Sequence, residues 1–238
     1  MGDVAIVSAN FARYDYVRAQ AEQDMDVEWF MFTDEAMDAP EPWRVVVEDG
    51  RGPHPNLAAK RFKLLPPVPH RFVVWIDASI QVTSPSFARE ALACINDGIA
   101  LHTHPYRDCI YKEAAVSFGP KYDGQPVQEQ VAHYREEGFP CNAGLYACGA
   151  MAWDRKDPRA KQLGRAWMDE CVRWTFQDQL AFPVLCQRLG IKPGTFPHDV
   201  YESPWFTIAE HRHKQEQHEA RRRMWRAQRE ASEGEAQP

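Results

Sequence analysis

The sequence predicts an α/β fold with a Rossmann-like mixed sheet flanked by helices. In the first half, short apolar runs typical of buried strands alternate with segments whose apolar residues have helical spacing. Strands are expected over residues 4–8, 27–33, 43–47 and 72–76. Helices are expected between them, over residues 16–23 and 57–65. Such alternation is typical of a doubly wound sheet.

The second half continues with longer helices and ends in a charged segment. The expected elements are, in order, a helix over 86–95, a strand over 98–102, a polar loop and helix over 121–137, and helices over 158–174 and 177–189. A stretch rich in proline and aromatic residues, 193–205, is expected to be irregular. Residues 211–230 are charged nearly all round, which predicts a solvated C-terminal helix.

Length and composition favour one large domain with a tail. Of the 238 residues, 44% are hydrophobic and 12% aromatic, enough for a packed core. We expect one domain over residues 1–210 and a charged helical tail over 211–238 that frays at its end. The amino terminus shows neither a basic leader nor an apolar run that could cross a membrane. A cytoplasmic protein without a transmembrane segment is therefore expected, with its oligomeric state open.

Charge and cysteine content narrow the function classes. The net charge is −6, although residues 211–230 hold seven Arg and Lys against three Glu. The acidic excess therefore falls on residues 1–210, so no nucleic-acid partner is expected for this domain. The six cysteines are scattered without a Cys-x-x-Cys pair. We interpret them as reduced, mostly buried thiols rather than a zinc site or a disulfide framework.

The most informative stretch is Arg71–Val82, where an apolar strand ends in one carboxylate, Asp77. Ligands of open α/β sheets bind outside the carboxyl ends of the strands, so an acid there can reach a diphosphate, a sugar hydroxyl or a metal. The alternative is a helix cap, since Ser79 and Ser84 lie nearby and a helix could begin at Pro85.

Two further clusters fit the same edge of the sheet. Polar residues follow the first two strands, in Ser8–Asp15 and Phe32–Asp34, although either run also suits a turn or cap. The helix before the Asp77 strand carries three cations that could neutralise phosphate, namely Lys60, Arg61 and Lys63. A solvated helix face is the alternative for these cations.

Two more clusters lie in the second half. The run Leu101–Glu113 packs two His, an Arg and a Glu at the end of a strand. Gln177–Gln179 opens an apolar helix, where Asp178 could also be a simple N-terminal cap. The chain lacks both Gly-x-Gly-x-x-Gly after the first strand and a Gly-Lys-Ser/Thr loop. Neither a standard dinucleotide site nor a P-loop is therefore expected.

Together these motifs resemble those of GT-A glycosyltransferases. Asn56–Pro66 followed by Val74–Ser79 is similar to a basic helix that precedes an Asp-Ala-Asp turn, and Asn142–Gly144 and Asp178–Gln179 resemble motifs of glycogenin-like retaining families. A closer resemblance is to the TOD/MUCI glycosyltransferase-like family. It spans roughly residues 4–185 through six motifs in order: Ser8–Asp15, Phe32–Asp34, Trp75–Ser79, His104–Ala114, Gly144–Leu145 and Gln177–Leu180.

The resemblance implies a GT-A fold that transfers a sugar from a nucleotide-sugar, with a UDP-sugar the expected donor, to a glycan acceptor. It implies that Asp77 takes the first position of the Asp-x-Asp motif and that Asp178 orients the donor or acts as base; both are the catalytic candidates. The implied donor-binding residues are Asn10, Tyr14, Asp34, Lys60, Arg61, Lys63, Asp77 and Ser79. The implied sugar or acceptor residues are His104, Arg107, Glu113, Asn142, Gly144 and Gln179.

Ser79 departs from the family pattern, because it stands where most metal-dependent GT-A enzymes have a second Asp. A serine hydroxyl is a poor ligand for Mn²⁺ or Mg²⁺, which prefer charged oxygens. The candidate ligands for such a divalent metal are Asp77, His211 and His213, although His-x-His in a charged tail also suits a solvated position. Without a metal, the candidates for binding the diphosphate would be the basic residues Lys60, Arg61, Lys63 and Arg107.

Three alternative functions remain open at this point. A nucleotidyltransferase uses a similar sheet, but it would have a glycine-rich basic loop after the first strand, and Ser8–Arg13 contains no glycine. A non-catalytic protein that binds sugar-nucleotides or glycans is compatible with Ser79. A third alternative is that the basic tail docks to another molecule.

Overall fold

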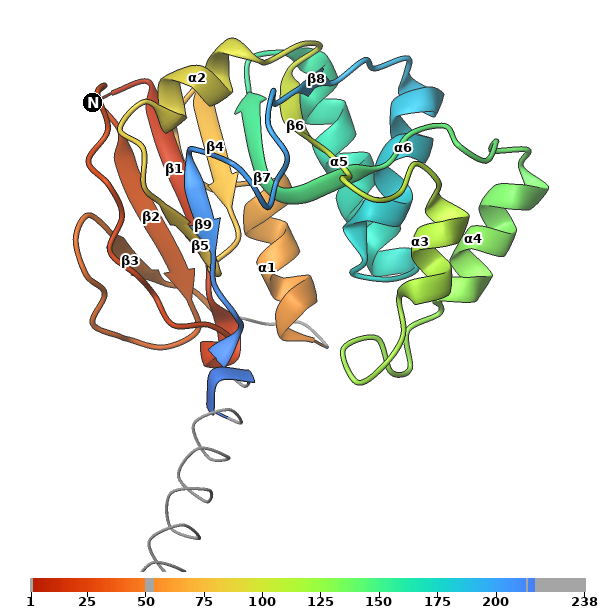
Figure 1. The fold of residues 1–238 in the computed structure, drawn as a ribbon, viewed down its shortest axis with the longest axis horizontal. Helices are drawn as coiled ribbons and strands as arrows, with labels where there is room; N and C mark the ends of the chain where they lie inside the picture. The colour runs from red at the N-terminus through yellow and green to blue at the C-terminus, as the bar shows by residue number, and fades with distance from the viewer. Residues whose placement is uncertain (1, 50–53, 213, 217–238) are drawn as a thin grey trace, which may run out of the picture.

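A mixed seven-stranded sheet forms the centre of the fold within the described residues, 2–49, 54–212 and 214–216 of this computed structural model (Figure 1). Its strands lie in the order β3 (Arg44–Val47), β2 (Glu28–Thr33), β1 (Val4–Ala9), β4 (Phe72–Ile76), β7 (Tyr146–Asp154), β6 (Ile99–Thr103) and β8 (Gly194–Thr195). A small second sheet pairs β5 (Ile80–Val82) with β9 (Phe206–Ile208).

Strand direction decides which residues meet at the sheet edge. Strands β3, β2, β1 and β4 run parallel, so the carboxyl ends of β1 and β4 lie side by side. Strand β7 runs antiparallel between β4 and β6. The early residues of β7 therefore lie beside the end of β4, and the fold gathers both segments at one place.

Helices cover both faces of the sheet. One face packs against α1 (Pro55–Leu64), α5 (Pro158–Arg173) and α6 (Asp178–Leu189). The other packs against α2 (Phe87–Ala93) and the segment 196–206. Helices α3 (Ile110–Val116) and α4 (Val127–Glu136) form a further apolar cluster with α6, seen at the side of the sheet in Figure 1.

The core follows the two-residue period of the strands. In β4, Val73 and Trp75 face the α1 side, whereas Val74 and Ile76 face the α2 side. Helix α1 packs closely against α5 at Gly164, where an added Cβ atom would lie 2.5 Å from the Leu64 carbonyl oxygen. The absence of a side chain at this position therefore allows the close packing of α1 on α5.

The structure confirms the predicted α/β class with a mixed sheet flanked by helices. The predicted helix over residues 16–23 is wrong, because the backbone there pairs with residues 82–85. The Ala21 N–H donates to the Val82 carbonyl at 3.0 Å, and Gln20 Oε1 accepts from the Val82 N–H at 2.7 Å. Farther along, the Asp24 N–H donates to the Pro85 carbonyl at 2.8 Å. These long-range bonds replace those that a helix would make with itself.

Several short elements and one long strand escaped prediction. Helix α3 and strands β5, β8 and β9 have two to seven residues, too few to show a period. Strand β7 is buried on both faces and rich in small residues, so it shows no alternation. The predicted C-terminal helix lies mostly outside the described residues and stays a prediction.

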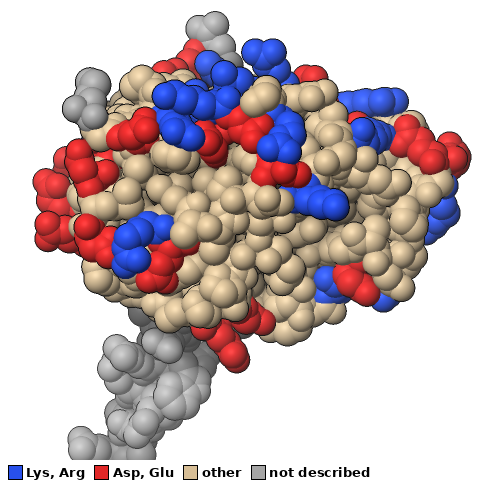
Figure 2. Space-filling model, turned by 90° about the horizontal axis from the view of Figure 1, so that it is seen from above, with Lys and Arg blue, Asp and Glu red and all other residues tan. Residues whose placement is uncertain are grey.

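Surface charge, helix hydrophobicity and the state of the cysteines can each be compared with the sequence predictions. On the face shown in Figure 2, Lys and Arg side chains are interspersed with Asp and Glu rather than gathered into one basic surface. No helix of the described residues is long and apolar enough to cross a membrane. All six cysteines are free thiols, four of them buried.

Candidate functional site

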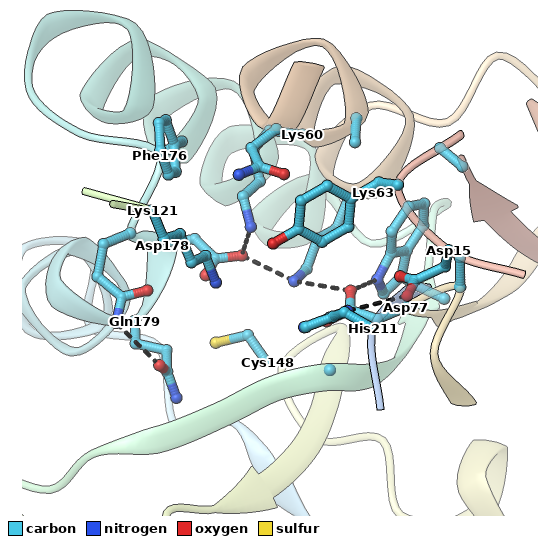
Figure 3. A pocket seen from close by; sticks show the side chains of 18 of the residues that line it. Asp15, Lys60, Lys63, Asp77, Lys121, Cys148, Phe176, Asp178, Gln179 and His211 are labelled. Carbon is cyan, nitrogen blue, oxygen red and sulfur yellow. Dashed lines mark hydrogen bonds and ion pairs between the residues drawn. The ribbon is translucent and has the colours of Figure 1, made fainter. Parts of the chain in front are cut away.

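One pocket opens at the carboxyl ends of β1 and β4 and encloses about 280 Å³. Its walls come from the loop after β1, helix α1, the turn after β4, the start of β7 and the start of α6. Residues of the loop 117–126 and of the segment 200–211 complete the lining (Figure 3). Because ligands of open α/β sheets bind at this edge, the pocket is the candidate site.

Asp77 follows β4 directly, and its carboxylate is oriented by the protein while staying open to a ligand. The Asp77 N–H donates to the Gly149 carbonyl on β7 at 2.8 Å, which fixes the turn. Trp75 Nε1 donates to Asp77 Oδ1 at 2.8 Å, and Lys63 Nζ lies 3.5 Å from the same oxygen. The Asp77 side chain remains 46% exposed.

Asp178 is the first residue of α6, and its side chain is buried. Lys60 Nζ and Lys63 Nζ each lie 2.7 Å from Asp178 Oδ2. The two lysines are three residues apart on α1, so they share one face of that helix. Lys63 contacts Asp178 on one side and Asp77 on the other, and thereby joins the two carboxylates (Figure 3).

The contacts of Lys63 and Asp178 favour the charged form of each of these two side chains. Burial alone would raise the pKa of Asp178, but Lys60 and Lys63 outweigh it and leave that pKa below its usual range. Burial alone would lower the pKa of Lys63, but Asp178 and Asp77 outweigh it and leave that pKa raised. Two positive and two negative charges cancel, so the cluster by itself brings no net charge to a phosphate.

Lys121 adds a further cation to the pocket wall. Within the described part of the pocket, the ion pairs join Lys60 and Lys63 to the two carboxylates, and His211 to Asp15, so none includes Lys121. Burial raises the pKa of Tyr14, and the Lys121 charge partly offsets this rise. The positive charge of Lys121 thus interacts electrostatically with Tyr14 on the other wall of the pocket.

A tight loop after β1 forms the opposite wall. Asn10 closes it, because Nδ2 donates to the Asp15 carbonyl at 2.8 Å and Oδ1 accepts from the Asp15 N–H at 2.9 Å. Ala12 has a φ of 53°, a left-handed conformation that is costly for a residue with a Cβ atom. Both oxygens of Asp34 accept from the Ala12 N–H, at 3.1 and 3.0 Å. Asp34 therefore stabilises this loop from outside the pocket.

His211 brings the C-terminal part of the domain onto this loop. Its Nδ1 lies 2.9 Å from Asp15 Oδ1, and its ring packs edge-on against Tyr14 with centroids 4.9 Å apart. The pairing of β9 with β5, which follows the Asp77 turn, positions His211. A residue distant in sequence thus completes the pocket wall.

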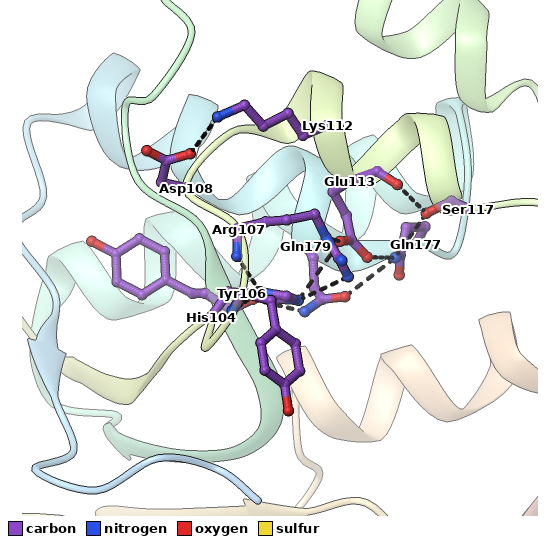
Figure 4. A network of polar contacts seen from close by, with 10 residues as sticks. His104, Tyr106, Arg107, Asp108, Lys112, Glu113, Ser117, Gln177 and Gln179 are labelled. Carbon is purple, nitrogen blue, oxygen red and sulfur yellow. Dashed lines mark hydrogen bonds and ion pairs between the residues drawn. The ribbon is translucent and has the colours of Figure 1, made fainter.

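A second polar cluster lies next to the pocket (Figure 4). Arg107 Nε donates to Glu113 Oε2 at 2.5 Å, and His104 Nδ1 accepts from the Arg107 N–H at 3.0 Å. Gln177 Nε2 donates to Glu113 Oε1 at 3.0 Å, and Gln179 Nε2 donates to the Tyr146 carbonyl at 2.9 Å. Both glutamines line the pocket, so the cluster touches it through their amides.

The Asn142–Gly144 turn packs against the loop after β6. The Gly144 N–H donates to the Asp108 carbonyl at 3.0 Å, and Lys112 Nζ donates to Asn142 Oδ1 at 3.1 Å. Gly144 has a φ of 97°, which only glycine adopts at low cost. This glycine is therefore explained by the turn rather than by contact with the pocket.

Comparisons with known proteins identify the family and agree with the fold. A family model described as the TOD1/MUCI70 glycosyltransferase-like domain matches residues 52–213, more than half of the chain. The chain belongs to this family. Among solved structures it is similar to the WbbM bifunctional glycosyltransferase in its apo structure, with a TM-score of 0.51 and 14% sequence identity. The match covers 81% of this chain and 38% of that chain, and it shows the fold alone. No curated protein matches the chain.

Membership of the TOD1/MUCI70 family confirms the predicted GT-A-like glycosyltransferase class. Of the predicted site residues, those that line the pocket are Asn10, Tyr14, Lys60, Lys63, Asp77, Asp178, Gln179 and His211. The pocket lining does not include Asp34, Arg61, Ser79, His104, Arg107, Glu113, Asn142 and Gly144. His213 lies outside the described residues.

Two of the predicted donor residues of this TOD1/MUCI70 domain lie away from the pocket for identifiable reasons. Arg61 is on the exposed face of α1, where its guanidinium lies 5.6 Å from the centroid of the Phe62 ring. Ser79 is buried, and its carbonyl accepts from the Ala209 N–H at 2.9 Å. Neither residue is part of the pocket lining.

Sequence reasoning missed several pocket residues: Asp15, Asn56, Trp75, Lys121, Tyr122, Cys148, Gly149, Phe176, Gln177 and Tyr201. Asp15, Trp75 and Gln177 stand inside the motifs that carried the TOD1/MUCI70 resemblance, so those motifs were the available signal. Lys121 lies in an irregular segment without a motif, and only the tertiary fold reveals it. Tyr201 begins an aromatic run, Tyr201–Phe206, which from the sequence could either cover the acceptor cleft or complete the core.

The donor set does not fit a resident divalent metal. Among the residues that the structure describes, no three His, Cys, Asp or Glu side chains converge as ligands. Asp178 is bound by two lysines and His211 by Asp15, which leaves Asp77 as the exposed carboxylate. Mg²⁺ is usually held by one or two carboxylates together with substrate phosphates and waters, so Asp77 alone would not hold a metal ion before a diphosphate binds. The predicted metal stays a prediction, and the proposal below uses none.

Proposed function

We propose that the chain transfers a sugar from a nucleotide-sugar, with a UDP-sugar the expected donor, to a glycan acceptor in this pocket. One observation carries the proposal: Lys63 is buried between Asp77 and Asp178 at the carboxyl end of the sheet. Burying such a cluster is costly, and a helix cap alone does not require it. Membership of a glycosyltransferase-like family supports the same class of reaction.

The departing nucleoside diphosphate needs positive charge around it. Its negative charge grows as the bond to the sugar breaks, and fixed cations in a pocket can stabilise that change. Lys60 and Lys63 are already matched by carboxylates, whereas Lys121 is not. We therefore assign the main contact with the diphosphate to Lys121. Lys60, whose side chain is partly exposed although it pairs with Asp178, supplies a second contact.

The two carboxylates take different roles in this proposal. Lys60 and Lys63 keep the pKa of Asp178 low, which makes it a weak proton acceptor. Asp178 is therefore suited to hold a sugar hydroxyl in register rather than to act as general base. Asp77 is more exposed and is oriented by Trp75, so it can contact the donor directly.

A thermal-shift panel tests the donor site. UDP, GDP, CDP and dTDP are each added with Mn²⁺, with Mg²⁺ and with EDTA, since a ligand that binds the native state raises Tm by mass action. We expect one nucleotide, UDP, to raise Tm in EDTA as well as with metal. Lys121→Ala should abolish that rise, whereas Lys161→Ala, on the exposed face of α5, should keep it.

The outcomes separate the competing functions. A shift that needs Mn²⁺ or Mg²⁺ would contradict the lysine assignment and indicate a metal-assisted donor site. UDP release from UDP-sugars is measured separately, in the presence of glycan acceptors. A rise of Tm without any such release would indicate a protein that binds sugar-nucleotides without turnover. The absence of a shift with every nucleotide would contradict the donor site itself.

A further inference from the structure

Two tyrosines expose most of their surface beside the pocket. Tyr106, after β6, is 71% exposed and Tyr201, between β8 and β9, is 62% exposed. Their rings stack with centroids 5.8 Å apart and an interplanar angle of 19°. The two residues belong to segments far apart in sequence, and neither is part of a core cluster. The core therefore does not account for this pair.

One tyrosine of the pair lines the pocket, and the other is connected to the polar cluster beside it. Tyr201 itself lines the pocket. The Tyr106 N–H donates to His104 Nδ1 at 3.2 Å, and the neighbouring Arg107 contacts Glu113. Figure 4 shows Tyr106 beside His104 in the network that also holds Arg107 and Glu113. The exposed rings thus lie at the pocket mouth with polar side chains around them.

The chemistry of this surface suits a sugar ring. The face of an aromatic ring carries partial negative charge, and the C–H groups on one face of a pyranose are weakly positive, so the two surfaces stack. The surrounding His104 and Arg107 can bind hydroxyl groups at the edge of the ring. A protein partner would instead need a broader apolar surface than two tyrosines provide.

The topology separates this surface from the expected nucleotide position. Tyr106 follows β6, which lies beyond β7 from β4 and β1, whereas Asn10 and Tyr14 follow β1. A donor whose base lies over the β1 side and whose sugar lies near Asp178 leaves the Tyr106 side to the second substrate. The position therefore favours the acceptor rather than the nucleobase.

We infer that Tyr106 and Tyr201 form a stacking subsite for a pyranose unit of the acceptor glycan. This inference rests on the proposed function, because it assigns the acceptor side of the same pocket. The unit that stacks on the tyrosines directs the acceptor chain, so that its reacting hydroxyl faces the donor sugar near Asp178. His104 and Arg107, which the sequence predicted on the acceptor side, orient the subsite.

The test is binding to an array of immobilised oligosaccharides of glucose, galactose, mannose, xylose, rhamnose and galacturonic acid, with UDP present. Native protein should bind at least one of them. Tyr106→Ala and Tyr201→Ala should each weaken that binding by about tenfold, equivalent to about 1.4 kcal/mol. Tyr106→Phe keeps the ring and should bind nearly as well as native protein. Phe118→Ala is the matched control, because Phe118 is 76% exposed but does not line the pocket.

The same samples are measured for the rise of Tm with UDP, which separates two kinds of failure. If native protein responds to UDP but binds no oligosaccharide, or if the alanine variants bind as tightly as native protein, the stacking subsite is wrong while the donor site stands. If the alanine variants lose the UDP response while Phe118→Ala keeps it, the tyrosines bind the nucleotide and the inference is overturned. If native protein responds to neither ligand, the proposed function fails as well.

Discussion

Lys63 and Asp178 form an ion pair inside the protein, with Nζ and Oδ2 2.7 Å apart and side chains that are 2% and 6% exposed. Removing one partner of such a pair leaves a charge without compensation in a medium that solvates it poorly. The pair is therefore a structural requirement as well as a candidate part of the site.

Lys63→Met should lower the free energy of unfolding by on the order of 3 kcal/mol, because Asp178 keeps only Lys60 as a partner. Lys60→Met is the matched control, since its side chain is 15% exposed and water can replace part of its contact. It should cost less. Urea unfolding of both variants measures the difference. Equal stability of the two variants would show that the burial of Lys63 has no special cost.

Asp77→Asn should reduce kcat/KM by at least about a hundredfold while leaving Tm almost unchanged. The amide can still accept from Trp75 Nε1, and the side chain is partly exposed, so only the charge is lost. Asp169→Asn, an exposed position on α5 outside the pocket, controls for the loss of a carboxylate. A large fall in Tm with little change in rate would instead make Asp77 a structural residue.

Stability should fall in mild acid because of His102. Burial lowers the pKa of His102 to about 4, with His198 acting in the same direction, and neither ring nitrogen has a hydrogen-bond partner among the described residues. The unfolded chain binds a proton near the usual pKa of about 6.5, so this contribution is present above that pH. It is lost as the pH falls towards 4.

The expected loss from His102 over this interval is about 3 kcal/mol. His102→Phe should flatten the pH dependence, because a phenyl ring can pack on Phe196 and Phe206 without taking up a proton. Urea unfolding at a series of pH values measures both proteins. An unchanged pH profile in the variant would assign the acid sensitivity to other groups.

Cys109 and Cys141 should form a disulfide on mild oxidation, because their sulfur atoms lie 2.7 Å apart. Burial alone would raise the pKa of Cys109, but hydrogen bonds from Cys141 and Asn142 outweigh it and lower that pKa. Oxidised glutathione would take up the two electrons and two protons and leave as two reduced molecules. Peptide mapping detects the cross-link. Cys141→Ser should abolish it, and a cross-link between another pair of cysteines, such as one through Cys171, would contradict the expectation.

The sequence predicted the elements that carry a strong apolar pattern. It located Asp77 because this residue ends an apolar strand, and Asp178 because it begins an apolar helix. It could not predict the irregular path of residues 16–23, since the partners of that segment are residues 82–85. It also predicted as donor-binding some residues that do not line the pocket. Arg61 lies next to Lys60 in sequence, but the helix turns it towards solvent.

Lys121 and Tyr201 show a second limit of the sequence. Both stand in segments without a period, and both reach the pocket only through tertiary packing. Asp34 is the opposite case: its position after a strand predicted a donor-binding role, whereas it lies outside the pocket lining and accepts from the Ala12 N–H. Motifs indicate which segments meet, whereas the side chains that reach the ligand depend on backbone geometry.

The contact between Asp15 and His211 joins residues 196 positions apart in the chain. During translation the loop after β1 emerges early, but its partner leaves the ribosome only after β9 has been made. Contacts of such long range form late because closing the intervening chain costs entropy. A chain that ends before β9 would therefore lack His211 and the wall that it completes at the pocket.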